Sequence, residues 1–183
     1  DWTNTPSPTS ANLGGGCAIS KSNAWVVADN GTILHWDGTA WSVTGALTTS
    51  PLYGIWASGA NDAWAVGDSG TILHWNGTLW SLAQGPVKAA LDSVHGSASN
   101  DVWAVGAEGA MLHWDGVRWI EFSATPHHLR SVQMLSPGDG WAMGNGGTIL
   151  RWDGSDWLPV ASPTTDDLYS LSMAGQDAGW AVG

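Results

Sequence analysis

The chain has 183 residues, enough to bury one sizeable hydrophobic core, and we expect a single domain over residues 1–183. Its formal net charge of −11 comes from 16 acidic residues against 5 lysines and arginines, which argues against binding to nucleic acid. No apolar run approaches the roughly 20 residues needed to cross a bilayer, so we expect no membrane insertion.

The opening segment, DWTNTPSPTS, is polar and does not have the pattern of a signal peptide. The low lysine count and the loops rich in Ser, Thr and Pro predict an extracellular or cell-surface protein. The single cysteine, Cys17, cannot form an internal disulfide, and we interpret it as a small buried apolar residue.

Tryptophan recurs with a spacing of 38 or 39 residues, and all 15 tryptophans except Trp56 fall into three series. A fixed period in this range predicts a propeller or a solenoid. The first series is Trp25, Trp64, Trp103, Trp141 and Trp180. The second is Trp2, Trp41, Trp80, Trp119 and Trp157, and the third is Trp36, Trp75, Trp114 and Trp152.

Each copy of the repeat contains four short strand patterns separated by turn residues. In the second copy these are Leu52–Ala57, Ala63–Gly67, Thr71–Trp75 and Leu79–Ala83. The turn between the third and fourth strands carries Asp-Gly or Asn-Gly in every copy, which predicts a two-residue type I′ hairpin. These turns are Asp37-Gly38, Asn76-Gly77, Asp115-Gly116 and Asp153-Gly154.

The predicted fold is therefore an all-β propeller of four-stranded antiparallel blades with a period of about 39 residues. We expect five blades, with the N-terminal strand completing the last one. The expected units are a lone strand in 1–12, blades at 13–51, 52–90, 91–128 and 129–167, and a partial blade at 168–183. The partial blade has no third strand, so three alternatives stay open: an excerpt of a longer array, a strand supplied by a partner, or an open ring.

The fourth copy, LRSVQMLSPGDGWAMGNGGTILRWDGSDW (129–157), resembles the repeat of the photosystem II assembly and stability factor family, with its GWAVG, GTIL and DGG elements. That family belongs to the BNR or Asp-box propellers, so the resemblance implies toroidal β-propeller blades over essentially the whole chain. The chain departs from the family because it has the sequence HWDG, HWNG or RWDG where the family has an Asp-box turn. The role of an assembly factor is therefore not carried across.

The first two tryptophan series are best interpreted as packing between the blades, since large aromatic residues at equivalent positions fill the clefts between twisted sheets. The third series is different because each Trp follows a His or Arg and precedes an Asp or Asn. An aromatic ring beside a hydrogen-bonding group suits sugar rings, and repetition around a ring would add avidity. The more economical alternative is a structural His–Trp pair in each blade. The candidate ligand-binding residues are His35, Trp36, Asp37, His74, Trp75, Asn76, His113, Trp114, Asp115, Arg151, Trp152 and Asp153.

We expect no catalytic residues, no metal site and no cofactor. A sialidase would need an arginine cluster and a tyrosine nucleophile supported by a glutamate, and no calcium-loop spacing is present. The residues of those types lie at unrelated places in different blades: Arg118, Arg130, Arg151, Tyr53, Tyr169, Glu108 and Glu121. The adjacent His127 and His128 are interpreted as a solvated loop.

Taken together, these patterns favour a non-enzymatic, lectin-like module that binds carbohydrate at several repeated sites. The alternative is a protein-interaction or self-assembling scaffold that binds no sugar. Expected partners are thus a carbohydrate or a protein ligand, and the incomplete last blade adds homo-oligomerisation or strand completion in trans.

Overall fold

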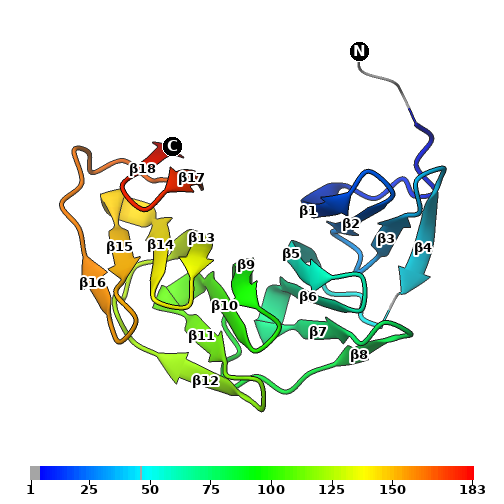
Figure 1. Ribbon diagram of the computed structural model, residues 1–183, viewed down its shortest axis with the longest axis horizontal. Helices are drawn as coiled ribbons and strands as arrows, with labels where there is room; N and C mark the ends of the chain where they lie inside the picture. The colour runs from blue at the N-terminus through cyan, green and yellow to red at the C-terminus, as the bar shows by residue number, and fades with distance from the viewer. Residues whose placement is uncertain (1–4, 46) are drawn as a thin grey trace.

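The computed structural model describes residues 5–45 and 47–183. These residues form four antiparallel sheets of four strands each and a final sheet of two strands. The sheets follow one another as blades of an open arc, with the first strand of each blade on the inner side (Figure 1). The predicted all-β propeller architecture is confirmed.

Every four-stranded blade is a meander in which sequence neighbours pair. The first blade contains β1 (Leu13–Ser20), β2 (Asn23–Ala28), β3 (Ile33–Trp36) and β4 (Trp41–Gly45). The second contains β5 (Leu52–Gly59), β6 (Asp62–Gly67), β7 (Ile72–Trp75) and β8 (Trp80–Leu82). The third contains β9 (Leu91–Ala98), β10 (Asp101–Gly106), β11 (Met111–Trp114) and β12 (Trp119–Phe122). The fourth contains β13 (Leu129–Ser136), β14 (Asp139–Gly144), β15 (Ile149–Trp152) and β16 (Trp157–Pro159), and the last sheet contains β17 (Ser170–Gly175) and β18 (Ala178–Val182).

The core lies between the blades. Along β10, Val102 to Val105 are all fully buried, because consecutive side chains point into the clefts on the two sides of the blade. Three short 3₁₀ turns, η1 (Asp68–Gly70), η2 (Ala107–Gly109) and η3 (Asn145–Gly147), join the second and third strands of blades two to four. No helix among the described residues is long and apolar enough to cross a membrane.

The turn between the third and fourth strands differs from the prediction. In the first blade Trp36 pairs with Trp41, so the loop has four residues rather than two. Only Gly38 of this loop has a positive φ, of 98°. The Asp37 carboxylate accepts hydrogen bonds from the backbone N–H groups of Thr39 and Ala40, at 2.8 and 2.9 Å. The type I′ prediction is wrong because the carboxylate, rather than a second positive φ, closes this turn.

The closure expected for the last blade is not seen in the described residues. Residues 5–12 form no strand, and Figure 1 places the N-terminal segment away from β17 and β18. The expected strand around Trp2 extends over residues 1–4, which lie outside the described part of the chain. Four blades and a hairpin leave a gap in the ring that the described N-terminal segment does not bridge.

Candidate functional site

The histidines of the third tryptophan series lie inside the blade structure. His74 stacks on Trp64 of the neighbouring strand, with ring centroids 4.1 Å apart. Its Nε2 is 2.7 Å from an oxygen of Asp62, which is also hydrogen-bonded to Ser58. The third blade repeats this arrangement with His113 stacked on Trp103 and bonded to Asp101, and the first blade with His35, Trp25 and Asn23.

Burial and hydrogen bonding act in opposite directions on the titration of these groups. Burial by itself would raise the pKa of Asp101, but the hydrogen bonds from His113 and Ser97 outweigh it and lower the pKa. In the first blade, burial lowers the pKa of His35, which has no carboxylate as its direct partner. These groups are therefore tuned by packing within the blade.

Three tryptophans of the third series, Trp75, Trp114 and Trp152, face the opposite cleft from the His or Arg that precedes them, as alternation along a strand requires. Trp75 packs against Trp25 of the preceding blade, with ring centroids 5.3 Å apart, and its Nε1 donates to the carbonyl oxygen of Ala60 at 3.1 Å. Trp114 and Trp152 pack in the same way on Trp64 and Trp103, each with centroids 4.8 Å apart. One face of each of these rings is thus covered by a neighbouring blade.

The Asp and Asn residues of the candidate set serve as hydrogen-bond acceptors in the turns. Asn76, Asp115 and Asp153 each accept two backbone N–H groups in the same manner as Asp37. Hydrogen bonds from Thr39 and Ala40 lower the pKa of the Asp37 carboxyl to about 2. All four of these residues are exposed.

Arginine replaces histidine in the fourth blade and joins it to the last sheet. The Arg151 guanidinium is 3.2 Å from Asp139 and 3.0 Å from Asp177, and it lies 5.2 Å from the ring centroid of Trp141. The structure therefore distributes the sequence-predicted site over successive blades and does not bring its members together into one pocket.

A different set of side chains does converge, at one mouth of the central channel. The second residue of each inner strand pattern differs from blade to blade, and these residues are Gly14, Tyr53, Asp92, Arg130 and Tyr169. The residue before each of them is a leucine, and Leu52, Leu91 and Leu129 are at most 1% exposed. Each inner strand pattern thus begins with a constant leucine, and the residue after that leucine varies and faces the channel.

We call Tyr53, Asp92, Arg130 and Tyr169, with His128, the channel mouth. Asp92 is its centre, because one carboxylate oxygen is 2.8 Å from Nε2 of His128 and 3.3 Å from Nη1 of Arg130. The Nε of Arg130 donates to Asn145 at 3.0 Å, and its guanidinium lies 5.7 Å from the ring centroid of Tyr169. Burial, with the nearby Asp68 and Asp92 charges, raises the pKa of Tyr53.

The channel mouth borders a hollow of about 450 Å³ lined by Tyr53, Ala90, Asp92, His128, Arg130 and Tyr169. A second hollow of about 580 Å³ shares four of these residues and continues along the inner strands. There, Nδ1 of His95 accepts the backbone N–H of Met134 at 3.2 Å, and burial lowers the pKa of His95. Cys17 is half-buried in this wall, where burial raises the pKa of its thiol.

This convergence corrects two interpretations made from the sequence. Tyr53, Arg130 and Tyr169 are not at unrelated places, because the curvature of the arc brings equivalent inner-strand positions to one opening. His128 is not a solvated loop residue either, since its side chain is 25% exposed and bonded to Asp92. The signal available in the sequence was the position after each periodic leucine, where the residue type changes from one copy to the next.

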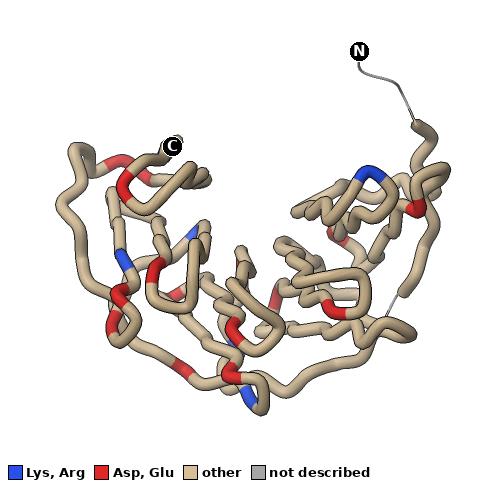
Figure 2. The backbone as a smooth tube through the Cα atoms, viewed as in Figure 1, with Lys and Arg blue, Asp and Glu red and all other residues tan. Residues whose placement is uncertain are grey.

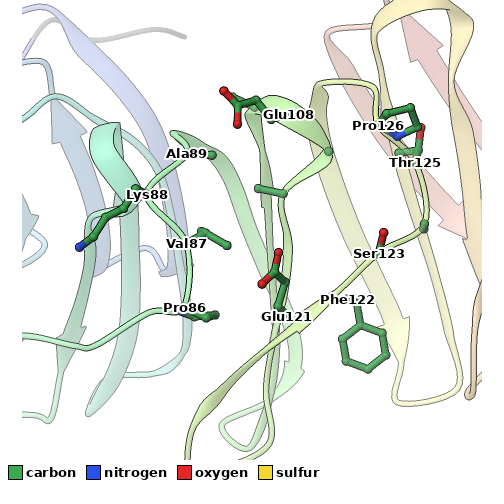
Figure 3. Close-up of a pocket in the computed structure, with 14 residues that line it drawn as sticks. Pro86, Val87, Lys88, Ala89, Glu108, Glu121, Phe122, Ser123, Thr125 and Pro126 are labelled. Atoms are coloured by element: carbon green, nitrogen blue, oxygen red, sulfur yellow. The ribbon is translucent and has the colours of Figure 1, made fainter.

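A further hollow, of about 750 Å³, lies beside the third blade (Figure 3). Its walls are the connecting segment 86–89, the end of β12 with the connection after it (residues 121–126), and η2 with Ala110. Its charged residues are Glu108, Glu121 and Lys88, and Lys88 is directed away from both glutamates (Figure 3). Its polar side chains do not converge on one point, so it is a weaker candidate than the channel mouth. Among the described residues, no group of three or more His, Cys, Asp or Glu could hold a metal ion.

No protein-family model and no curated protein matches the sequence. Solved propeller structures do match over 96% of the chain. YCF48 bound to a D1 peptide superposes with a TM-score of 0.74 at 18% identity, and YCF48 from Cyanidioschyzon merolae with 0.71 at 15%. The WD40 repeats of RRP9 superpose with a TM-score of 0.83 at 11% identity.

The chain spans 63%, 66% and 58% of the lengths of these three structures, respectively. At such low identities the likeness shows the fold alone, and that fold is the β-propeller. The WD40 repeats of RRP9 superpose with a higher TM-score than either YCF48 structure, although at lower sequence identity. The resemblance to the photosystem II factor family therefore holds at the level of the fold. An Asp-box repeat is not confirmed.

Proposed function

We propose that this chain is a protein-interaction propeller that binds an extended peptide segment of a partner protein at the channel mouth. The observation that carries the proposal is the convergence of four side chains from equivalent positions of a repeated scaffold, together with one histidine from a connecting segment. They are Tyr53, Asp92, Arg130 and Tyr169, with His128 beside them. A rigid scaffold with variable side chains at one opening is a common arrangement for selective binding.

The chemistry of the channel mouth suits a peptide. Tyr53 and Tyr169 are 38% and 57% exposed and offer rigid aromatic surface at low entropic cost. The Asp92 carboxylate and the guanidinium of Arg130 can exchange their mutual contact for contacts with peptide amides and side chains. The chain carries a net charge of −11, so long-range steering favours a basic segment. A propeller structure with a bound peptide is among the similar structures, which supports the class of ligand.

Selection from a phage-displayed library of random 12-residue peptides tests this proposal. We expect enriched sequences whose synthetic peptides bind the chain in calorimetry, with affinity reduced about tenfold or more in a Tyr53→Ala/Tyr169→Ala variant. Val117→Ala is the matched control, because Val117 is 82% exposed in a hairpin turn at the opposite ends of the strands. Peptides that bind the double variant as well as the unmodified chain, or no enrichment at all, would contradict the proposal.

Carbohydrate binding at the third tryptophan series stays a prediction, as does an extracellular location. The stacking faces at Trp75, Trp114 and Trp152 are partly covered by neighbouring blades, which makes sugar the weaker candidate. A multivalent glycan array decides between the two ligand classes. Glycan binding that is lost in a His74→Ala variant that still folds would restore the lectin interpretation.

A further inference from the structure

The chain contains three Asn-Gly pairs, which are Asn30-Gly31, Asn76-Gly77 and Asn145-Gly146. In such a pair the backbone nitrogen of the glycine can attack Cγ of the asparagine side chain, because glycine has no Cβ to obstruct the approach. The attack closes a five-membered succinimide ring, and the side-chain nitrogen leaves as ammonia. The surroundings of the three pairs differ, and these differences decide which pair reacts.

The glycine nitrogen, which is the nucleophile, is held by a hydrogen bond in two of the pairs. The N–H of Gly31 donates to the carbonyl oxygen of Ala28 at 3.2 Å, and the N–H of Gly146 donates to the Asp167 carboxylate at 2.8 Å. The N–H of Gly77 has no acceptor among the residues that the structure describes. A held N–H must give up its bond before the nitrogen can turn toward Cγ, so the fold restrains the first and third pairs and leaves the second able to react.

The side-chain carbonyl of Asn76, which is the electrophile, is polarised by the turn that closes its hairpin. Its Oδ1 accepts the backbone N–H groups of Thr78 and Leu79, both at 3.0 Å. Attack at Cγ places negative charge on this oxygen, and two N–H donors aimed at one oxygen form an oxyanion hole. Oδ1 of Asn30 accepts one backbone N–H, that of Thr32, at 3.2 Å.

The remaining differences point the same way. Oδ1 of Asn145 accepts the Nε of Arg130 at 3.0 Å, so the third pair is restrained at its glycine nitrogen rather than at its carbonyl. Asn30 and Asn76 are both exposed, so access of water does not distinguish them. Gly31, however, is buried, whereas Gly77 is half-buried. The hydrogen bonds of the glycine nitrogen therefore carry the distinction.

Three other blades already have an aspartate where the second blade has Asn76. Asp37, Asp115 and Asp153 accept the same pair of backbone N–H groups. When water opens the succinimide at Cγ, the product is an aspartate that can keep this turn. When water opens it at the backbone carbonyl, the product is isoaspartate, in which the main chain runs through the former side chain and the turn loses its acceptor.

We propose that Asn76 is a site of spontaneous deamidation, to which the folded chain directs a reaction that it suppresses at Asn30 and Asn145. The Gly77 nitrogen loses its proton to base and forms a bond to Cγ, while the bond between Cγ and Nδ2 breaks and ammonia leaves. One water molecule is then added as the ring opens, and nothing is oxidised or reduced. The modification adds one negative charge to a chain of net charge −11, and its site shares no residue with the channel mouth.

Incubation of the folded chain in mildly alkaline buffer, in which base removes the amide proton, tests the proposal. Proteolytic digestion and mass spectrometry follow the gain of about 1 Da at each asparagine. We expect Asn76 to react about tenfold faster, or more, than Asn30 and Asn145. In guanidinium chloride the three unfolded pairs should react at similar rates. An unreactive Asn76, equal rates in the folded chain, or the same preference in the unfolded chain would overturn the proposal.

Asp115→Asn provides a matched test, because it creates the same Asn-Gly turn in the third blade. Val117 and Arg118 supply the two N–H donors there, at 2.8 and 2.9 Å. The introduced asparagine should react at a rate similar to that of Asn76, and a slow reaction in a variant that circular dichroism shows to be folded would contradict the role of the turn. An isoaspartyl methyltransferase with labelled S-adenosylmethionine should label the proteolytic peptide that contains residue 76, and label confined to other peptides would overturn the proposal.

Discussion

Gly106 lies where the backbones of adjoining segments come closest. A Cβ atom at this position would be 2.0 Å from the carbonyl oxygen of Ala90, the residue before β9. Its φ of −175° is extended backbone that any residue adopts, so the need for glycine comes from the contact alone. The backbone N–H of Ala107 donates a hydrogen bond to the same Ala90 oxygen, with 2.8 Å between nitrogen and oxygen. Gly67 and Gly144 make the same close approach in the adjacent blades.

We expect Gly106→Ala to lower the free energy of unfolding by about 3 kcal/mol, because the methyl group overlaps a backbone atom that cannot move without separating two strands. Urea denaturation followed by tryptophan fluorescence measures the change. Gly59→Ala is the matched control, since a Cβ at Gly59 would meet nothing within 4 Å, and it should change stability by less than about 0.5 kcal/mol. Equal effects of the two substitutions would show that the close approach does not limit stability.

At the scale of the element, the three 3₁₀ turns place their middle residue in the left-handed region. Ser69 has φ 56° and Glu108 has φ 58°, whereas the fourth blade places Gly146 there with φ 65°. A non-glycine residue in this region costs of the order of 1 kcal/mol, which is only partly offset by the greater chain entropy of glycine when unfolded. The fourth blade has therefore adopted the residue that its backbone favours.

Glu108→Gly should accordingly raise the free energy of unfolding by about 0.5 kcal/mol, measured by urea denaturation. Glu108→Ala is its control, because it removes the same carboxylate and keeps the cost of the positive φ. If the two variants gain equal stability, loss of the negative charge rather than backbone relief is the cause.

The sequence predicts the blades well because the strands of each blade are encoded by local features that recur in every copy. The spacing of Trp64, Trp103 and Trp141 reflects one inward-facing position on the second strand of each blade, and this periodicity survives large changes in the loops. The loop type was missed because Asp-Gly is compatible with both two-residue and four-residue hairpins. The hydrogen bonds to Oδ1 of residues such as Asp37 decide between these loops, and the sequence pattern alone does not show them.

The channel mouth was missed for a different reason. Asp92 and Arg130 are 38 residues apart, and their contact depends on the angle between successive blades. No local pattern encodes that angle, and a search for repeated residues passes over positions that differ between copies. The same holds for His128, which lies in a connection with no counterpart of its type in the other copies.

At the scale of the whole molecule, stability is distributed along an open arc in which each blade contacts its neighbours in sequence. The interior blades have partners on both sides, and the side chains from Val102 to Val105 in β10 are completely buried. The last sheet has two strands, and Trp180, its one tryptophan, is 81% exposed. The acidic residues are spread along the arc with few basic residues between them, so repulsion adds little preference for any one blade (Figure 2).

Stability in such arrays is approximately the sum of unit terms and nearest-neighbour interfaces, and units at the ends open first. We therefore expect native-state hydrogen exchange, read by mass spectrometry, to show two classes of amide. Those of β17 and β18 should exchange through local opening at a free energy close to zero, while those of β10 should require global unfolding. Adding denaturant below the transition should speed exchange in β10 and leave β18 almost unchanged. Protection of β18 equal to that of β10 in the isolated chain would mean that its edge is already covered, and the open arc would then not describe the molecule in solution.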